Sequence, residues 1–295
     1  MAQKPNTIAA FFKRFPDDET CLQHLFDVRF GQGFSCPKCE RPSKWFRIKA
    51  ERAYSCQWCG HHLHPTVGTP FAKTRTPLQM WFYAIFLFTT TRNGVAAKEL
   101  QRQLGVTYKT AWRMADEIRK HMADVDGDAT IGGPFKVVEA DETYIGGHKA
   151  GGQGGKGKAV VFGMLERGGK VVTEVVSDRR GNTLVPHILE HVDPYSEIHT
   201  DEHVGYGGLA IEGFRHQRIN HSAGEYARGH VSVNGIEGFW SQLKRSIQGT
   251  HIHVSPKHLW KYAKEAEFRF NRRDRPQEML TDLLSTFGPL PQQSD

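Results

Sequence analysis

No apolar run in the sequence is long enough to cross a membrane. The apolar stretch Met80–Phe88 has nine residues, whereas a transmembrane helix needs about 20. The first residues, Met-Ala-Gln-Lys-Pro-Asn, also lack the charged start and apolar centre of a signal peptide. We therefore expect a cytoplasmic protein that does not enter a membrane.

Cysteine is scarce, with five residues in 295, and these are clustered rather than scattered. That pattern argues against a disulfide framework and suits metal binding in a reducing compartment. Sixteen residues separate two Cys-x-x-Cys pairs, which are Cys36 with Cys39 and Cys56 with Cys59. This spacing predicts a tetrahedral site for structural Zn²⁺. Because the segments 44–48 and 52–54 have the pattern of strands, we expect residues 1–75 to form a zinc ribbon.

Acidic residues are fewer than basic ones, 32 against 39, which gives a net charge of +7. The excess is uneven, since nine Lys or Arg stand against three acids between Trp240 and Arg275. A basic balance favours a polyanionic partner. A length of 295 residues predicts two domains or three small ones, with a core large enough for a stable enzyme.

The middle of the chain is predicted to be helical. One apolar helix begins at Pro77, a second covers residues 95–104, and a third begins after Thr107, which is a good N-cap. Two helices joined by a short turn that contains glycine form the helix-turn-helix pattern. We expect residues 76–125 to be a helix-turn-helix domain that binds DNA, although a three-helix bundle that binds nothing has the same pattern.

The third of these helices carries the expected DNA contacts. Its residues Tyr108, Lys109 and Arg113 are predicted to face a groove of the DNA. The neighbouring residues Ala111, Trp112 and Ala115 are predicted to pack inward. The polar segments 124–128 and 132–134 that follow are expected to link this domain to the rest of the chain.

The C-terminal half alternates strand and helix patterns. Strands are predicted at residues 135–145, 158–165, 170–176 and 196–201, with a further short one at 214–219, and helices at 182–192, 230–244 and 256–271. This order is that of a ribonuclease H-like domain, a mixed sheet flanked by helices. We therefore expect an α/β multidomain protein whose residues 132–285 form the ribonuclease H-like domain.

Acidic residues recur on the elements that such a domain brings together. Asp141 is near the middle of the first strand, Asp201 ends the fourth, and Glu237 is on the following helix. Two strand carboxylates and one helix carboxylate can hold two Mg²⁺ ions about 4 Å apart. The pattern leaves alternatives, because Glu139 or Glu142 could face inward in place of Asp141, and Asp201 has the same ambiguity with its neighbour. Glu237, taken alone, is better explained as a solvated helix residue, and its role depends on what the other segments supply.

Four segments resemble the bacterial insertion-sequence transposases of the DDE type that carry an N-terminal zinc ribbon, the ISXO2-like family. They are Val138–Gly147, His199–Asp201, His230–Lys244 and Pro256–Arg273. The resemblance implies a retroviral-integrase-like catalytic domain that uses Mg²⁺ or Mn²⁺. It also implies binding to double-stranded DNA, both the element's terminal inverted repeats and the target, followed by strand cleavage and transfer. A homodimer or larger assembly on DNA, close to the bacterial nucleoid, is expected.

The resemblance assigns roles residue by residue. Asp141, Asp201 and Glu237 match the metal-binding triad. Lys244 matches the basic residue seven positions later and is expected, with Arg245, to contact DNA near the cleavage site. Two further residues are possible members of the site: Asn234, since some relatives have Asn as the third ligand, and His230, which could orient a water or a phosphate. A carboxylate offsets cation charge better than an amide does, which favours Glu237.

Two other functions fit parts of this pattern. A structure-specific nuclease of the same fold would hydrolyse DNA without joining it. A non-catalytic regulator would keep the zinc ribbon and the helix-turn-helix but would need a degenerate catalytic domain, which the intact triad disfavours.

Overall fold

The computed structural model describes residues 6–146, 158–220 and 227–288. The chain divides into two compact units. The helical unit comprises residues 1–125 and 275–295, and the sheet unit comprises residues 126–274. Each unit is described separately.

The helical unit begins with two helices and a small sheet. Asp17 caps the second helix by accepting a 2.8 Å hydrogen bond from the Thr20 amide, and acidic residues in the first turn favour the same end of the helix. The Phe26 ring of this helix stacks on Tyr54 of the sheet, with 4.1 Å between ring centroids. The bounds are α1 Ile8–Arg14, α2 Asp18–Arg29, β1 Trp45–Ile48, β2 Ala53–Cys56 and β3 His62–Leu63, and the strands pair in this order as an antiparallel sheet.

Three further helices of this unit follow the expected pattern. They are α3 Leu78–Thr90, which is largely buried, α4 Ala97–Leu104 and α5 Tyr108–Asp126. Gly105 ends α4 in the left-handed conformation, with φ of 65°. Thr107 caps α5 as predicted, because its Oγ1 accepts a hydrogen bond from the Thr110 amide.

One residue of α5 differs from the prediction. Trp112 was expected to pack inward, but it is 39% exposed. The buried stripe of α5 passes through Ala111, Ala115 and Ile118, and each residue turns the helix by about 100°. Trp112 therefore lies beside the stripe, on the same exposed face as Tyr108.

The last helix, α9 (Met279–Ser285), packs against α2 and α3. The sequence prediction placed it in the sheet domain, which was expected to extend to residue 285. Two hydrogen bonds help to fix it in the helical unit, from His24 to the Leu284 carbonyl (3.0 Å) and from His121 to the Leu283 carbonyl (2.8 Å). Its apolar side chains are buried there, which offsets the cost of ordering the segment.

The sheet unit is built on a five-stranded mixed sheet in the order β10-β9-β5-β6-β7. Antiparallel pairing joins β5 to β6 and β6 to β7, whereas β9 runs parallel to β5, and β10 parallel to β9. The bounds are β5 Val137–Ile145, β6 Ala159–Glu166, β7 Val171–Val176, β9 Glu197–Thr200 and β10 Arg215–Arg218. Two short strands, β4 Ile131–Gly132 and β8 Val192–Asp193, pair separately. The predicted mixed sheet with flanking helices is confirmed.

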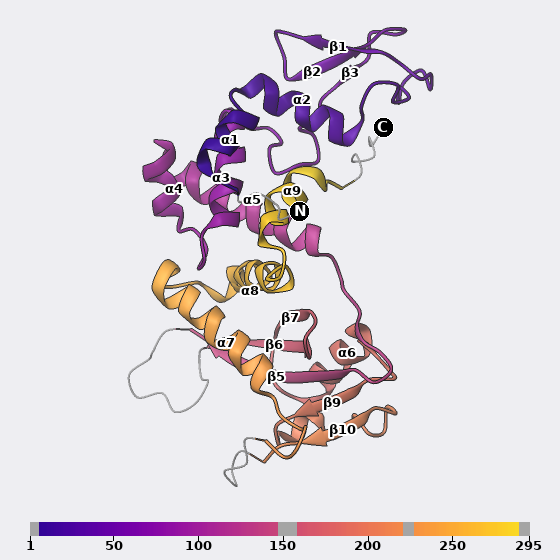
Figure 1. Cartoon of the computed structure of the whole chain (residues 1–295), viewed down its shortest axis with the longest axis vertical. Coiled ribbons are helices and arrows are strands. Elements are labelled where there is room, and N and C mark those ends of the chain that lie inside the picture. The colour runs from indigo at the N-terminus through magenta and orange to yellow at the C-terminus, as the bar shows by residue number, and fades with distance from the viewer. Residues whose placement is uncertain (1–5, 147–157, 221–226, 289–295) are drawn as a thin grey trace. The chain divides into compact units, whose positions relative to one another are not determined.

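Helices cover both faces of this sheet. One face packs against α6 (Gly181–His191), and the other packs against α7 (Asn234–Ser246) and α8 (Pro256–Asn271). Figure 1 shows α7 crossing β5 and β6, with α6 beyond them. The α7 helix was expected to begin at His230, but it begins at Asn234 because residues 228–231 form a narrow turn closed by the bridge between Arg228 and Val231.

Candidate functional site

The four paired cysteines converge at one point. The Sγ atoms of Cys36 and Cys59 are 3.6 Å apart, and those of Cys39 and Cys56 are 3.8 Å apart. Four thiolates placed about 2.3 Å from zinc in a tetrahedron lie about 3.8 Å from one another. All four sulfurs lie within 4.8 Å of one another. The cluster therefore fits one structural Zn²⁺ and leaves no open position for catalysis.

Neighbouring groups favour a thiolate in this cluster. Burial opposes ionisation, yet hydrogen bonds from the Ser43 hydroxyl (3.2 Å) and from backbone amides that include that of Trp58 lower the pKa of the Cys56 thiol to about 6. Cys21 is different: burial raises the pKa of its thiol to about 12, and it packs in the core as expected for a small apolar residue.

The acids of β5 separate onto two faces of the sheet because side chains alternate along a strand. Asp141 faces α7, where its Oδ2 accepts a 2.9 Å hydrogen bond from the Trp240 indole. Glu142 points to the other face, where it bonds the Tyr206 hydroxyl and pairs with Arg179 at 3.0 Å. The two neighbouring acids therefore have different surroundings, and Glu142 is already paired.

Asp201 lies near Asp141, directly after the end of β9 at Thr200. The parallel register pairs Val137 with Glu197 and Glu139 with His199, and Asp201 follows His199 by two residues, as Asp141 follows Glu139. Burial, together with the negative charges of Glu142 and Asp201, raises the pKa of Asp141 to about 7. The pair therefore forms a pocket of negative charge that a divalent cation would offset.

Glu237 lies on α7, the helix whose Trp240 contacts Asp141. It is exposed and lies one turn before Trp240, so both residues project from the same side of the helix. Trp240 packs over Gly163, which pairs with Asp141 in the register. A Cβ atom at Gly163 would meet the Trp240 ring at 2.6 Å, so only glycine allows the helix to approach so closely. The oxygens of Asp141, Asp201 and Glu237, all described residues, do not all lie within 4.8 Å of one another.

Glu139 has a role that the sequence did not indicate. Its buried carboxylate accepts hydrogen bonds from Arg167 Nε (3.0 Å) and Nη2 (2.9 Å), and from the Ile236 amide (3.0 Å) in the first turn of α7. Arg167 also donates to the His230 and Ser232 carbonyls. A carboxylate at this end of a helix satisfies an otherwise unpaired N–H and complements the helix dipole. Glu139 and Arg167 therefore clamp the start of α7, and we call them the α7 clamp.

His230 and Asn234 lie at the beginning of α7. Asn234 is its first residue and is exposed. His230 precedes the helix, so it is not two turns from Glu237 on a helical face, as the sequence suggested. Its Nε2 lies 3.0 Å from Glu197 Oε1, which also bonds His199. These three could ligate a metal by distance, but Arg215, 3.4 Å from Glu197, makes a hydrogen-bond network the better description.

The predicted DNA contacts lie on both units. On α5, Tyr108 is 51% exposed and Lys109 is exposed, whereas Arg113 donates a 2.9 Å hydrogen bond to the Ala72 carbonyl. On α7, Lys244 is half-buried and lines a groove, and Arg245 is exposed. Each of the five predicted residues therefore lies on a surface that solvent reaches.

The basic C-terminal stretch is only partly available to a partner. Three of its cations pair within the sheet unit: Lys264 with Glu267 and Glu174, Arg269 with Glu265, and Arg272 with Asp126.

Among the described residues, no helix combines the length and apolar character that a membrane span requires.

Comparisons with known proteins match two separate parts of the chain, one in each unit. The profile of the ISXO2-like transposase domain matches residues 132–271, and that of the transposase zinc-ribbon domain matches residues 16–62. The chain is similar to an uncharacterized transposase-like protein of Haemophilus influenzae, with 40% identity over 105 residues. That match covers 36% of this chain and 84% of the relative.

Proposed function

Because the chain belongs to the ISXO2-like transposase family, we propose that it cleaves DNA at the ends of an insertion sequence and joins the freed 3′ ends to target DNA. The observation that carries this proposal is the proximity of Asp141, on β5 and in contact with α7, to Asp201, directly after β9. The strand order, with acids on β5, after β9 and on α7, supports a ribonuclease H-like catalytic domain.

Asp141, Asp201 and Glu237 would hold Mg²⁺ or Mn²⁺. Carboxylate oxygens suit these cations, and the raised pKa of Asp141, caused by burial and neighbouring charge, is what an uncompensated acidic site produces. When bound, such ions activate a water or 3′-hydroxyl and stabilise the leaving oxygen.

The chain's own residues position these groups. Trp240 donates a hydrogen bond to one oxygen of Asp141 and so orients its carboxylate. The α7 clamp fixes the start of the helix that carries Glu237. Lys244, two turns further along, would neutralise a phosphate of the bound strand. Asn234, one turn before Glu237, is the alternative third ligand, but its amide offsets no cation charge.

The helical unit would bind the inverted repeats. Its α4 and α5, joined by three residues with glycine at the first, support a helix-turn-helix, with Tyr108, Lys109 and Arg113 as the contacts. Residues 1–75 would add the zinc ribbon and residues 76–125 the reading helix, while catalysis belongs to the domain that begins at residue 132. Joining two element ends requires at least a dimer on DNA.

The test is a joining reaction with full-length protein. A donor plasmid that carries the inverted repeats bracketing this reading frame is mixed with a target plasmid and Mg²⁺ or Mn²⁺. The proposal predicts nicks at the repeat ends followed by donor–target products on a gel. Nicked donor that never becomes joined would identify a nuclease instead, and a protein that binds the repeats without cutting them would be a regulator.

A further inference from the structure

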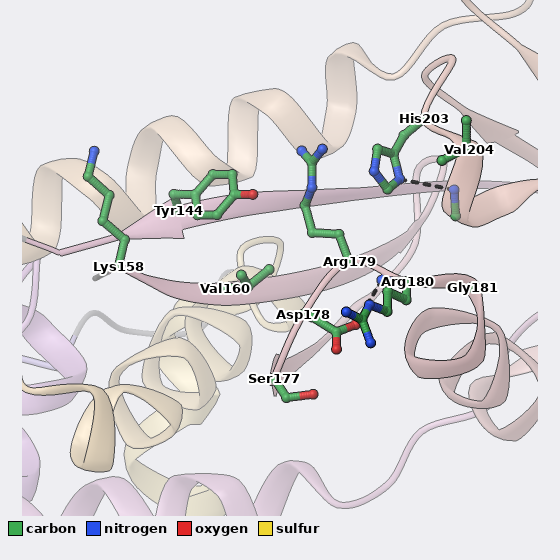
Figure 2. A pocket seen from close by; sticks show the side chains of 11 residues that line it. Tyr144, Lys158, Val160, Ser177, Asp178, Arg179, Arg180, Gly181, His203 and Val204 are labelled. Atoms are coloured by element: carbon green, nitrogen blue, oxygen red, sulfur yellow. Dashed lines mark hydrogen bonds between the residues drawn. The ribbon is translucent and has the colours of Figure 1, made fainter. Parts of the chain in front are cut away.

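A groove of about 610 Å³ lies on the α6 face of the sheet, at the end where β5 finishes and β6 begins. We call it the α6 groove. Figure 2 shows Lys158, Tyr144, Arg179 and His203 in a row along it, contributed by four different segments. These segments are the start of β6, the end of β5 and the loops after β7 and β9, so the fold assembles the groove from residues distant in sequence.

The groove carries positive charge that acidic residues of the sheet unit do not fully neutralise. Lys158 and Arg180 form no ion pair with any described residue. Arg179 is partly offset by Glu142, 3.0 Å away. Asp178 also lines the groove, but its Oδ1 accepts hydrogen bonds from the Arg180 amide and the Thr183 hydroxyl, both at 2.8 Å. Lys158 and Arg180 therefore form no ion pair among the described residues, although the Arg180 charge also interacts with Asp178.

A second groove, of about 400 Å³, shares two of these walls. We call it the α7 groove. Tyr144 and Lys158 line both grooves, and Lys244 and His253 line the α7 groove on its far side. The two grooves therefore meet at the end of β5 and form one track, from Arg180 past Lys158 to Lys244.

The α7 groove brings the track to the face of the sheet that Asp141 occupies, since Ile145 and Lys244 line that groove. Tyr144 follows Asp141 by three residues, or about 10 Å of extended strand, and His203 follows Asp201 by two. The Tyr144 ring at the junction lies 5.5 Å from the Arg179 guanidinium. A basic groove with an aromatic ring is the arrangement that binds unpaired nucleic acid, because phosphates contact the cations and a base stacks on the ring. Each groove also has the volume of a pocket for one small molecule.

We propose that the track holds a single DNA strand, unpaired from its complement, where the strand enters the catalytic site. This inference rests on the proposed function. The phosphates of this strand contact Lys158 and Arg180 on one side and Lys244 on the other, and a base stacks at Tyr144. The protein would then prefer element ends whose strands are already separated.

The test compares two probes that carry the same inverted repeat. One is a blunt duplex, and the other is forked, with unpaired bases beyond the repeat. Full-length, zinc-loaded protein is titrated with each in buffer that lacks Mg²⁺ and Mn²⁺, and fluorescence anisotropy gives the affinities. Wild type should bind the fork about tenfold more tightly, which is the gain expected from stacking of one base. Equal affinities for the two probes would overturn the proposal.

Variants assign the preference to the track. The double variant Lys158→Ala, Arg180→Ala should lose the fork preference. The slope of the logarithm of its binding constant against the logarithm of salt concentration should become shallower by about 1.4, because each single-strand phosphate contact contributes about 0.7. The matched control removes two charges at the opposite end of the same strands, with Lys136→Ala and Lys170→Ala, and should keep the preference. Equal loss in both double variants would also overturn the proposal.

Tyr144 separates stacking from charge. Tyr144→Ala should lose most of the fork preference, whereas Tyr144→Phe, which keeps the ring, should retain it. The joining reaction separates this inference from the proposed function. A protein that cleaves and joins without fork preference refutes the track alone, and one that prefers forks but never cleaves refutes the transposase activity alone.

Discussion

Glu139 offers a direct test of how the helix that bears Glu237 is held in place. Its side chain is 2% exposed, and it pairs with Arg167, which is 37% exposed. Removal of one partner from a buried ion pair costs about 3–5 kcal/mol. Because Arg167 is partly solvated, we expect Glu139→Ala to lower the free energy of unfolding of the sheet unit by about 3 kcal/mol. Glu139→Gln keeps an acceptor for one N–H and should lose about half as much.

Hydrogen exchange measures this effect where it occurs. In Glu139→Ala the Ile236 amide loses its acceptor, so exchange at the start of α7 should accelerate about a hundredfold, since each 1.4 kcal/mol is about a factor of ten. Cleavage should fall by about two orders of magnitude because Glu237 shifts with the helix. The exposed Glu212 gives the matched control, and Glu212→Ala should change neither quantity. Lost cleavage with unchanged exchange would refute the clamp and make Glu139 a metal ligand.

Three further predictions follow from the same contacts. Gly163→Ala should destabilise the sheet unit by about 1–3 kcal/mol and abolish cleavage, because the new methyl group overlaps the Trp240 ring. A thermal melt measures the stability and the joining reaction measures the activity. A fully active variant would contradict the prediction. In metal-free protein, burial and neighbouring charge raise the folded-state pKa of Asp141 to about 7, above its unfolded value, so the free energy of unfolding should fall as pH rises from about 4 to 7. Urea titrations should show that Asp141→Asn lacks this fall and is more stable than wild type at pH 8. Parallel pH profiles of the two proteins would contradict the prediction. Cys56→Ser should lower bound zinc from one ion per chain and weaken binding to the inverted repeats, but it should leave hydrogen exchange of the sheet unit unchanged. Mass spectrometry measures the zinc content and the hydrogen exchange, and fluorescence anisotropy measures the binding. Full zinc content in the variant would contradict the four-cysteine site.

Local patterns were enough to predict most of the elements. Short apolar runs next to glycine-containing turns indicated β5, β6 and β7, and the Cys-x-x-Cys spacing indicated the cysteine cluster, because both signals depend on residues close in sequence. The helix α9 was misplaced because its partners α2 and α3 are distant in the chain. Amphipathic character shows that a helix will bury one face, but it does not show against which element.

The candidate site shows the same limit. Asp141 and Asp201 were indicated by acids in otherwise apolar strands, but sequence alone could not choose between Asp141 and its neighbours. Glu139 took on a distinct role only through contact with Ile236, 97 residues away. Gly163 had no signal at all, since its importance comes from the ring that packs over it.

DNA joining should depend on Asp141, Asp201 and Glu237 together. The most direct measurement uses a pre-cleaved inverted-repeat end with a free 3′-hydroxyl, a target plasmid and Mg²⁺, and it compares single variants at equal DNA occupancy. We expect joined products from wild type and from Asn234→Ala, and none from Asp141→Asn, Asp201→Asn or Glu237→Gln. Joining by Asp141→Asn at the wild-type rate would contradict it.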